Sequence, residues 1–219
     1  MQADSRPVIG IVGGTGHLGG ALAGRWAAAG YRVVLGSRDA GRAADAARKL
    51  EARGQVTGTG NLEAAASADL IVLAVPFASQ QATLEDIRAA CAGKLVVDAT
   101  VPLMPPKVMR VQLPAEGCAA LRAQQLLGES VTVVSAFHNV AAHRLAVDGP
   151  VDCDVLVFGD KREARDRVIE LAEAIGLRGL HAGSLANSAA AEALTSVLIF
   201  INKHYSADGS GFRITGIGG

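Results

Sequence analysis

Short apolar runs alternate with amphipathic stretches along most of this chain. Buried strands are expected where apolar and β-branched residues follow one another between glycines, polar residues or a proline. Such runs occur at residues 8–12, 31–35, 69–75, 95–98, 131–137 and 155–158, with a further strand near residue 56. Apolar residues at helical spacing predict helices at 17–29, 40–53 and 161–175, and others after residues 61 and 79. This alternation predicts an α/β fold with a Rossmann-type, doubly wound and mostly parallel sheet.

The rest of the chain departs from this alternation in two places. Four prolines lie between residues 100 and 114, where we expect an irregular loop at the carboxyl edge of the sheet, the edge that faces ligands. Near the end, apolar residues at helical spacing predict a long helix. We expect its apolar face to be buried against the domain or a second subunit. The face is formed by Leu194, Val197, Leu198, Ile201 and Tyr205.

One domain with a small C-terminal extension is therefore expected. A Rossmann domain is predicted at residues 1–150, and a small α/β extension at 151–219 is predicted to pack on it and to end in the long helix. The extension would complete the ligand cleft and provide the contact of a homodimer.

Composition narrows the class of protein. Half of the 219 residues are hydrophobic and 26 are glycine, which is typical of a buried sheet with tight turns. The 21 basic residues balance the 21 acidic ones, so no long-range field favours nucleic acid or an anionic membrane. The most apolar late run, 197–201, is far too short to cross a bilayer. Three widely spaced cysteines fit neither a disulfide framework nor a metal site, so we expect a cytoplasmic protein with buried thiols and no metal.

A glycine-rich turn follows the first predicted strand directly. Gly14, Gly16 and Gly19 form the GxGxxG pattern between a strand and a helix, which is the context that a dinucleotide site requires. We expect Gly14 to allow the tight turn, Gly16 to let the backbone approach a pyrophosphate, and Gly19 to let the helix pack close to the strand. The pyrophosphate is then expected at the positive end of the helix.

The end of the second strand indicates which nicotinamide cofactor binds. An acidic residue about 20 positions after the glycines binds the ribose of NAD, but here Ser37 and Arg38 follow a glycine instead. A hydroxyl and a planar guanidinium suit a 2′-phosphate, and Arg42 lies one helical turn further on. Asp39 has two alternatives, a pair with Arg38 or a cap on the following helix. The sequence therefore predicts NADP(H) rather than NAD.

Several segments taken together resemble one family. They are GGTGHLG at 13–19, GSR at 36–38, LAVPF at 73–77, SAFH at 135–138, AGSLANS at 182–188, EALT at 192–195 and GFRITGI at 211–217. This combination runs nearly end to end and resembles the NADPH-dependent reductases of coenzyme F420, a deazaflavin. The first two segments also occur in other Rossmann oxidoreductases, so the specificity comes from the combination.

The resemblance implies an activity and the residues that serve it. The activity is hydride transfer between NADP(H) and coenzyme F420 as co-substrate, with both reacting carbons supplied by the cofactors. The resemblance implies that the glycine turn contacts the phosphates through Gly14, Thr15, Gly16, His17, Leu18 and Gly19. It implies that the 2′-phosphate is held by Ser37, Arg38 and Arg42. The nicotinamide is implied to contact Val75, Pro76, Phe77, Val140 and Ala142.

Two polar residues end predicted strands near this cleft. His138 either donates to the carbonyl region of the deazaflavin, mainly to position it, or bonds to backbone as an ordinary strand-end histidine. Asp98 is expected to cap the loop that follows its strand.

Two other functions remain open. One is an NADPH-dependent reductase of a small imine or carbonyl substrate, as in pyrroline-carboxylate-type reductases, which generally carry a longer helical C-terminal region. The other is a non-catalytic NADP(H)-sensing module that acts through its terminal helix. The short segment after the sixth strand favours an open site for a large flat partner. The direction of hydride transfer, the deazaflavin tail length and the role of Arg213 do not follow from the sequence.

Overall fold

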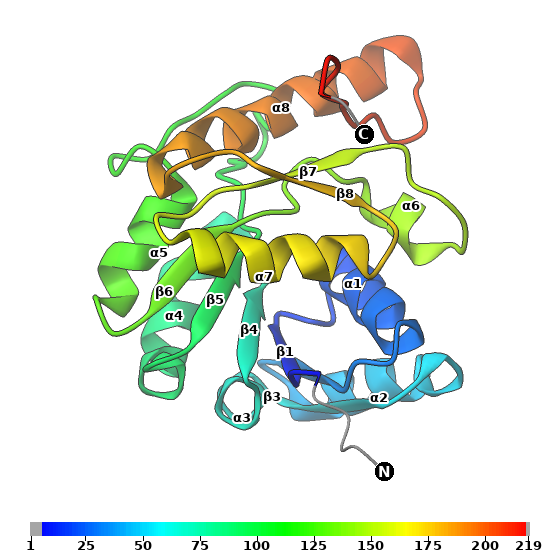
Figure 1. Cartoon of the computed structure of the whole chain (residues 1–219), viewed down its shortest axis with the longest axis vertical. Coiled ribbons are helices and arrows are strands. Elements are labelled where there is room, and N and C mark those ends of the chain that lie inside the picture. Colours follow the sequence, from blue (N-terminus) through cyan, green and yellow to red (C-terminus); the bar gives the residue numbers. More distant parts are fainter. Residues whose placement is uncertain (1–5, 218–219) are drawn as a thin grey trace.

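Six parallel strands form the central sheet of the computed structural model, which describes residues 6–217 (Figure 1). Residues 1–5, at the start of the expected Rossmann domain, and residues 218–219, at the end of its extension, lie outside the described residues. The strand order β3-β2-β1-β4-β5-β6 is the expected Rossmann topology, and the order reverses between β1 and β4. The strands are β1 (Ile9–Val12), β2 (Val33–Ser37), β3 (Val56–Gly60), β4 (Leu70–Leu73), β5 (Leu95–Asp98) and β6 (Thr132–Ser135).

Alternate residues of the strands face two hydrophobic cores, because side chains in a strand point to opposite faces. On one face, Ile11 and Val72 pack with Trp26, and on the other face Val12 and Ile71 pack among a second set of helices. Each such fully buried aliphatic side chain stabilises the fold by about 1.5–3 kcal/mol. The first face is covered by α1 (His17–Ala28), α2 (Ala40–Arg48) and α7 (Arg162–Glu173), and the second by α3 (Asn61–Ser67), α4 (Phe77–Cys91) and α5 (Ala119–Leu127).

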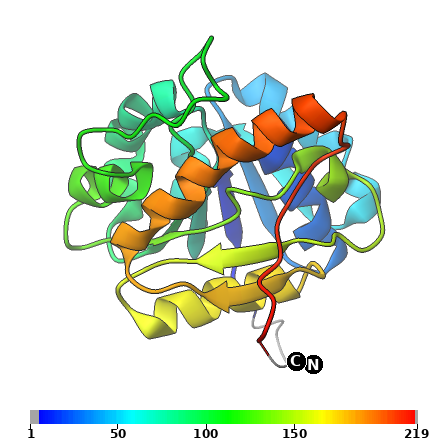
Figure 2. The same cartoon turned by 90° about the horizontal axis from the view of Figure 1, so that it is seen from above.

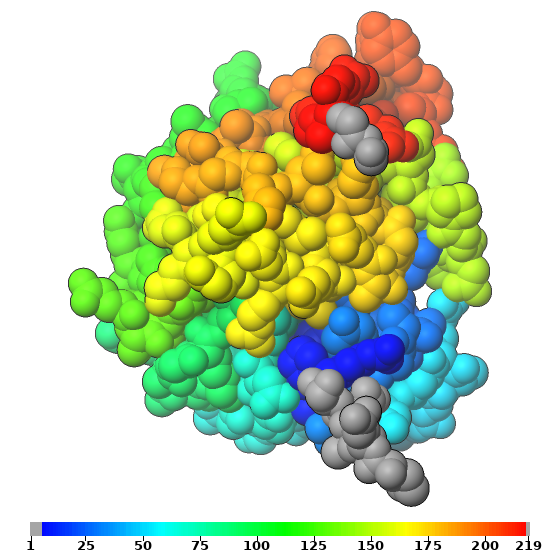
Figure 3. All heavy atoms as spheres, in the orientation of Figure 1, coloured from blue at the N-terminus to red at the C-terminus, as the bar shows by residue number. Residues whose placement is uncertain are grey.

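The C-terminal part forms a layer of its own. Strands β7 (Asp154–Val157) and β8 (Arg178–His181) make a separate two-stranded parallel sheet, and an antiparallel bridge between Ser135 and Phe158 joins it to the end of β6. Helix α7 connects the two strands and packs in the core on one face of the central sheet. The yellow surface in Figure 3 shows that this part of the chain covers the near side of the molecule. After the last helix the chain returns along this layer, where Asp154 N donates to Phe212 O at 2.9 Å.

Some elements were not predicted. Strand β8 contains a glycine and two polar residues, so it has no apolar run, and α5 follows the proline-rich loop without a strand signal before it. The short helix α6 (Ala142–Ala146) and the 3-10 turns η1 (Glu51–Arg53) and η2 (Leu185–Asn187) also carry no clear apolar pattern. Each is shorter than the window over which periodicity is informative.

The last helix, α8 (Ser188–Tyr205), crosses the carboxyl edge of the sheet (Figures 1 and 2). Its apolar face is only partly covered: Leu198 is buried, but Val197 is 42% exposed and Tyr205 is 72% exposed. Polar Ser188 and Glu192 face inward instead. Of the two expected alternatives, burial of this face against the domain is therefore only partial, because hydrogen bonds of the inward polar residues orient the helix, and burial against a second subunit stays a prediction.

Residues Leu185–Tyr205 form a segment of 21 residues that is long and apolar enough to cross a membrane by length and composition. The run at 197–201 alone did not indicate this. Within the apolar window of this segment, 33% is buried in the protein.

Candidate cofactor site

The glycine turn between β1 and α1 lies at the centre of the carboxyl edge. Gly13 has φ +78°, which L side chains rarely adopt, and its N–H donates to Asn61 Oδ1 at 3.2 Å. The left-handed residue of the turn is therefore Gly13, which the motif alone does not single out. A Cβ on Gly14 would lie 2.6 Å from Leu35 Cδ2, and a Cβ on Gly19 would lie 2.9 Å from Gly14 Cα. The packing of the protein itself thus requires glycine at 14 and 19.

Gly16 is different, because the protein around it leaves room for a side chain. The nearest atom to an added Cβ is Gly13 O at 3.4 Å, and φ is −74°, which suits any residue. Gly16 is the N-cap of α1 without a side-chain cap, and the first turn of this described helix contains no acidic residue. A helix N-terminus with uncapped N–H groups attracts anions. The turn therefore fits a pyrophosphate that approaches the backbone at Gly16.

The end of β2 brings a hydroxyl and two cations together. Ser37 is buried, and its Oγ accepts a hydrogen bond from Asp39 N at 3.2 Å. Asp39 caps α2, with Oδ1 accepting from Arg42 N at 3.1 Å, so the cap is the alternative that is found. The side chains of Arg38 and Arg42 are exposed, and within residues 6–217 neither forms an ion pair. Both guanidinium groups are thus free for a ligand.

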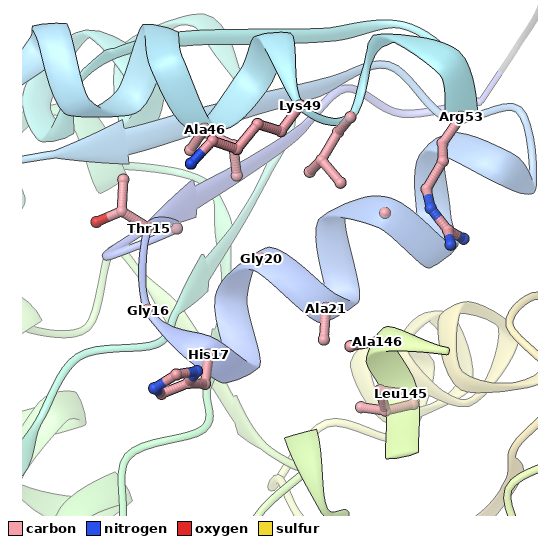
Figure 4. A pocket seen from close by; sticks show the side chains of 14 residues that line it. Thr15, Gly16, His17, Gly20, Ala21, Ala46, Lys49, Arg53, Leu145 and Ala146 are labelled. Carbon is pink, nitrogen blue, oxygen red and sulfur yellow. The ribbon is translucent and has the colours of Figure 1, made fainter. Parts of the chain in front are cut away.

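Two hollows adjoin the glycine turn. One, of about 340 Å³, lies between the turn, α1, α2 and α6 (Figure 4). The other, of about 450 Å³, is lined by Thr15, Arg42, Asp45, Ala46 and Lys49. Lys49 lines both hollows, and its side chain runs along α2 toward Thr15 (Figure 4). Sequence reasoning missed Lys49, although its spacing of two helical turns from Arg42 was a signal that both share a face.

The residues after β4 lie on the other side of the turn. Val75 Cγ1 is 2.6 Å from the position of a Cβ on Gly13, so Val75 is in contact with the turn. Pro76 follows, and Phe77 begins α4 with its ring facing the Arg122 guanidinium at 5.0 Å from the ring centroid. The structure thus places Val75 at the turn and Phe77 toward α5.

The chain leaves β6 through a strained turn. Phe137 is buried and has φ 68°, which is rare for a bulky residue. Its ring meets Trp26 edge-on with centroids 5.8 Å apart, and Trp26 Nε1 donates to Leu171 O at 2.9 Å. Such a conformation costs about 1–3 kcal/mol and persists only where the surroundings impose it, often at functional sites.

His138 is buried beside this turn, with Nε2 2.8 Å from Ser135 Oγ. Burial lowers the pKa of His138 to about 4, against a hydrogen bond to the Asp98 backbone, so the ring is neutral near pH 7. The ring thus has protein partners in Ser135 and the Asp98 backbone. Of the two alternatives for His138, these contacts favour a histidine that is bonded to the protein.

From this turn the chain crosses the carboxyl edge back to α1 (Figure 1). Val140 is buried in the core that contains Trp26, and Ala142 begins α6. Arg25 of α1 holds α6, with Nε donating to Leu145 O at 2.9 Å. The segment 137–142 therefore borders the site on a fixed path.

Two buried carboxyl groups lie beneath this edge. Asp98 accepts hydrogen bonds from Gln80 Nε2 at 2.8 Å and Thr100 N at 2.9 Å, which confirms its expected cap on the following loop. Glu192 of α8 accepts from Ala119 N at 2.6 Å, at the start of α5. Burial raises the pKa of Asp98 to about 6 and that of Glu192 to about 7. Glu192 was missed, although it is the one charged residue in the apolar stretch 189–201.

The described residues offer binding and positioning groups rather than a nucleophile. Cys91, Cys118 and Cys153 are all buried free thiols, as expected, and burial raises the pKa of each. Within residues 6–217, no group of three His, Cys, Asp or Glu side chains is arranged to hold a metal ion. What the edge provides is an anion site, free cations and a rigid, mostly apolar wall.

Comparisons with known proteins agree with this chemistry. A family model described as NADP oxidoreductase coenzyme F420-dependent matches residues 8–102. The chain is 43% identical over 220 residues to the F420-dependent NADP reductase of Methanothermobacter thermautotrophicus, covering 95% of each protein.

Solved structures are similar in fold. A protein from Arthrobacter sp. FB24, provisionally described as an F420-dependent NADP reductase, superposes with a TM-score of 0.82 at 24% identity, over 96% of this chain and 100% of that chain. A pyrroline-5-carboxylate reductase from Coxiella burnetii gives a TM-score of 0.56 at 16% identity, and this chain covers 58% of it. Since a relative with 43% identity spans nearly the whole chain, this protein is an oxidoreductase that belongs to the family of F420-dependent NADP reductases.

Proposed function

We propose that this protein transfers a hydride between NADP(H) and the deazaflavin coenzyme F420 at the carboxyl edge of its central sheet. The observation that carries the proposal is the start of α1, where Gly16 leaves a helix N-terminus open although the protein's own packing does not need glycine there. Beside it stand the free guanidinium groups of Arg38 and Arg42. The second coenzyme, F420, is inferred from relatives with 43% and 39% identity, which are named F420-dependent NADP reductases.

The adenosine half of NADP(H) is assigned to the glycine turn and the end of β2. We infer that backbone N–H groups of Thr15, His17 and Leu18 bind the pyrophosphate, with Gly14, Gly16 and Gly19 shaping the turn. Ser37, Arg38 and Arg42 then hold the 2′-phosphate. Ser37 Oγ keeps its own hydrogen for donation, because it accepts one from Asp39 N. Lys49 adds a further cation at the same hollow.

The nicotinamide half is assigned to the walls on either side of the turn. When bound, the two cofactors supply the hydride donor and acceptor carbons, so the protein has to position rings and exclude water. The walls are formed by Val75, Pro76, Phe77, Val140 and Ala142. His138 contributes by holding the segment that carries Val140, and we therefore infer that it is a positioning residue.

The extension and the quaternary structure complete the proposal. We infer that residues 1–150 bind NADP(H), that residues 151–219 complete the deazaflavin side, and that the protein is a cytoplasmic homodimer that contacts neither nucleic acid nor membrane. The support for a dimer is the outer face of α8, where Val197 is 42% exposed and Phe200 is 51% exposed. Light scattering of Val197→Ser/Phe200→Ser protein should show a monomer where the parent protein is a dimer.

An absorbance assay tests the reaction. Purified protein mixed with NADPH and oxidised F420 should bleach the visible absorption of the deazaflavin as NADPH is consumed, and NADH should be much less effective. Absence of bleaching with authentic coenzyme would contradict the proposal. NADPH oxidation by a small imine or carbonyl would then indicate the other reductase class, and NADPH binding without any turnover would indicate a sensing module.

A further inference from the structure

A network of four buried polar side chains connects α8 to the turn after β6. Ser135 Oγ lies 2.8 Å from His138 Nε2 and 2.5 Å from Ser188 Oγ, and Ser188 Oγ lies 2.8 Å from Glu192 Oε1. All four residues are buried, so solvent does not supply hydrogen-bond partners to these atoms. We call His138, Ser135, Ser188 and Glu192 the polar network.

The number of hydrogen atoms in this network restricts its protonation. Its three contacts need three hydrogens, and the two serine hydroxyls supply only two. A neutral His138 that donates to the Asp98 backbone from its other ring nitrogen offers Nε2 only as an acceptor. In that tautomer the third hydrogen comes from one end of the network, either from a neutral carboxyl group of Glu192 or from protonation of Nε2 to a cationic imidazolium.

The surroundings favour the carboxyl end. Burial lowers the pKa of His138 to about 4, and burial raises the pKa of Glu192 to about 7. Asp98 raises the pKa of Glu192 further, and the nearby thiol of Cys118 stays protonated because burial raises its pKa to about 11. In the proposed arrangement the protonated Oε1 of Glu192 still accepts from Ala120 N at 3.2 Å and donates to Ser188, while Oε2 accepts from Ala119 N. Ser188 then donates to Ser135, and Ser135 to a neutral His138.

Helix α8 holds the same turn at two more points. Thr195 Oγ1 donates to His138 O at 3.0 Å, and Asn139 Nδ2 donates to Ala191 O at 2.8 Å. One face of α8 thus fixes residues 135–139, which include the strained Phe137. Val140 and Ala142, the proposed nicotinamide wall, follow directly. The network is therefore placed to control the position of that wall.

We propose that His138 and Glu192 share one proton across Ser135 and Ser188, and that this proton holds the turn after β6 in position for hydride transfer. Glu192 is thereby a positioning residue that acts through the turn. When this proton is lost, only two hydrogens remain for the three contacts. Two acceptor atoms, either two oxygens or an oxygen and a nitrogen, then face each other without a hydrogen between them, and the turn shifts. The link to hydride transfer rests on the proposed function, whereas proton sharing is a property of the protein alone.

Nitrogen-15 NMR of the histidines in cofactor-free protein tests the shared proton. We expect His138 Nε2 to be an unprotonated acceptor below the pKa of Glu192, and its chemical shift to change as the pH rises through about 7. In Glu192→Gln the amide donates to Ser188 without titrating, so this change should be absent. A change in the His138 chemical shift that is caused by titration of Asp98 would persist in Glu192→Gln.

Ser196→Ala is the matched control, because Ser196 is a buried serine of the same helix whose Oγ contacts Arg110 O at 3.5 Å, outside the network. It should keep the pH dependence of the parent protein. The same His138 titration in the parent and in Glu192→Gln would overturn proton sharing, as would a His138 shift that does not respond to pH at all.

Single-turnover kinetics tests the positioning role. The rate constant of hydride transfer in the parent protein should fall at least about tenfold as the pH rises through the transition seen by NMR, since a small misplacement is costly. Glu192→Gln should hold a nearly constant rate over the same range, and Ser188→Ala should be about tenfold slower at every pH with unchanged NADPH affinity. Identical pH profiles in the parent and Glu192→Gln would overturn this role. Absence of any F420 turnover would instead contradict the proposed function, and NMR would still decide whether the proton is shared.

Discussion

The two ends of the proposed site are built in different ways. At the adenosine end, the binding groups lie within residues 13–19 and 37–49, and its cationic side chains are exposed. At the nicotinamide end, the segment 135–140 is buried, packs against Trp26 of α1 and is held by α8, and both helices lie far from it in the sequence. Exposed groups have few contacts to lose, so changes to the cationic side chains of the first end should alter ligand affinity without altering stability. Changes in the buried C-terminal layer should alter stability first.

The largest effect on affinity is expected at Gly16. Gly16→Ala should raise the Kd for NADPH by at least about 100-fold, because a side chain would occupy the space through which the pyrophosphate approaches the backbone. Its melting temperature should change little, since the nearest protein atom is 3.4 Å from the new Cβ. Fluorescence titration and thermal unfolding measure the two quantities.

Gly14→Ala is the control for this substitution. Its Cβ would lie 2.6 Å from Leu35 Cδ2, so it should lower the free energy of unfolding by about 1–3 kcal/mol. A similar loss of stability in both variants would show that Gly16 serves the packing and not the ligand.

Arg38→Ala should separate the two nicotinamide cofactors. Loss of a charge-assisted contact to the 2′-phosphate should weaken NADPH binding by about 2–3 kcal/mol, or roughly 30- to 150-fold, and leave NADH within about twofold. The control is Arg48→Ala, which removes a cation of α2 that pairs with Asp45 on the surface. Equal weakening of NADPH and NADH in Arg38→Ala would contradict the assignment of the 2′-phosphate.

Asp154→Asn tests the buried C-terminal layer. Asp154 is buried, accepts from Arg178 Nε at 2.8 Å and from Ile214 N at 2.6 Å, and so ties the returning tail to β7. Asp154→Asn should lower the free energy of unfolding by about 2 kcal/mol at neutral pH without changing the preference for NADPH. The exposed Asp152, which pairs with Arg213, is the control, and Asp152→Asn should stay within about 0.5 kcal/mol.

The same residue gives a pH dependence with a defined sign. The hydrogen bond from Arg178 is the main cause that lowers the pKa of Asp154 below its ordinary value. The folded state therefore favours the ionised carboxylate, and this stabilisation is present above the unfolded pKa and is lost as the pH falls through the folded one. Chemical denaturation across this acidic range should show a shallower pH dependence in Asp154→Asn than in the parent protein.

The smallest effect is expected at Lys49. It is an exposed cation at the end of α2 that lines the hollow with Arg42 and Thr15. Lys49→Ala should weaken NADPH binding about threefold, because a solvated lysine contributes less than a guanidinium in contact with phosphate. A loss as large as that of Arg38→Ala would show that Lys49 is a principal phosphate ligand.

Local patterns predicted the strand, glycine turn and helix and two of the caps. The glycine turn, the cap by Asp39 and the cap by Asp98 each involve residues within a few positions of one another, so chain geometry alone brings them together. The left-handed Gly13 was not singled out, because its close neighbours Ala74 and Val75 follow a distant strand. Lys49 and Glu192 were missed, since a spacing of two turns from Arg42 and a single charge in an apolar stretch are weak signals.

By itself, the sequence determined the alternation of strands and helices, the anion site at the start of α1 and the free cations after β2. Only the tertiary structure decided that α8 turns its polar residues inward, that His138 is buried against Ser135, and that Ser135 meets Ser188 across 53 positions of the chain. The reason is that periodicity specifies neighbours within one turn or one strand. The orientation of a helix against distant segments depends on which buried polar groups find partners there.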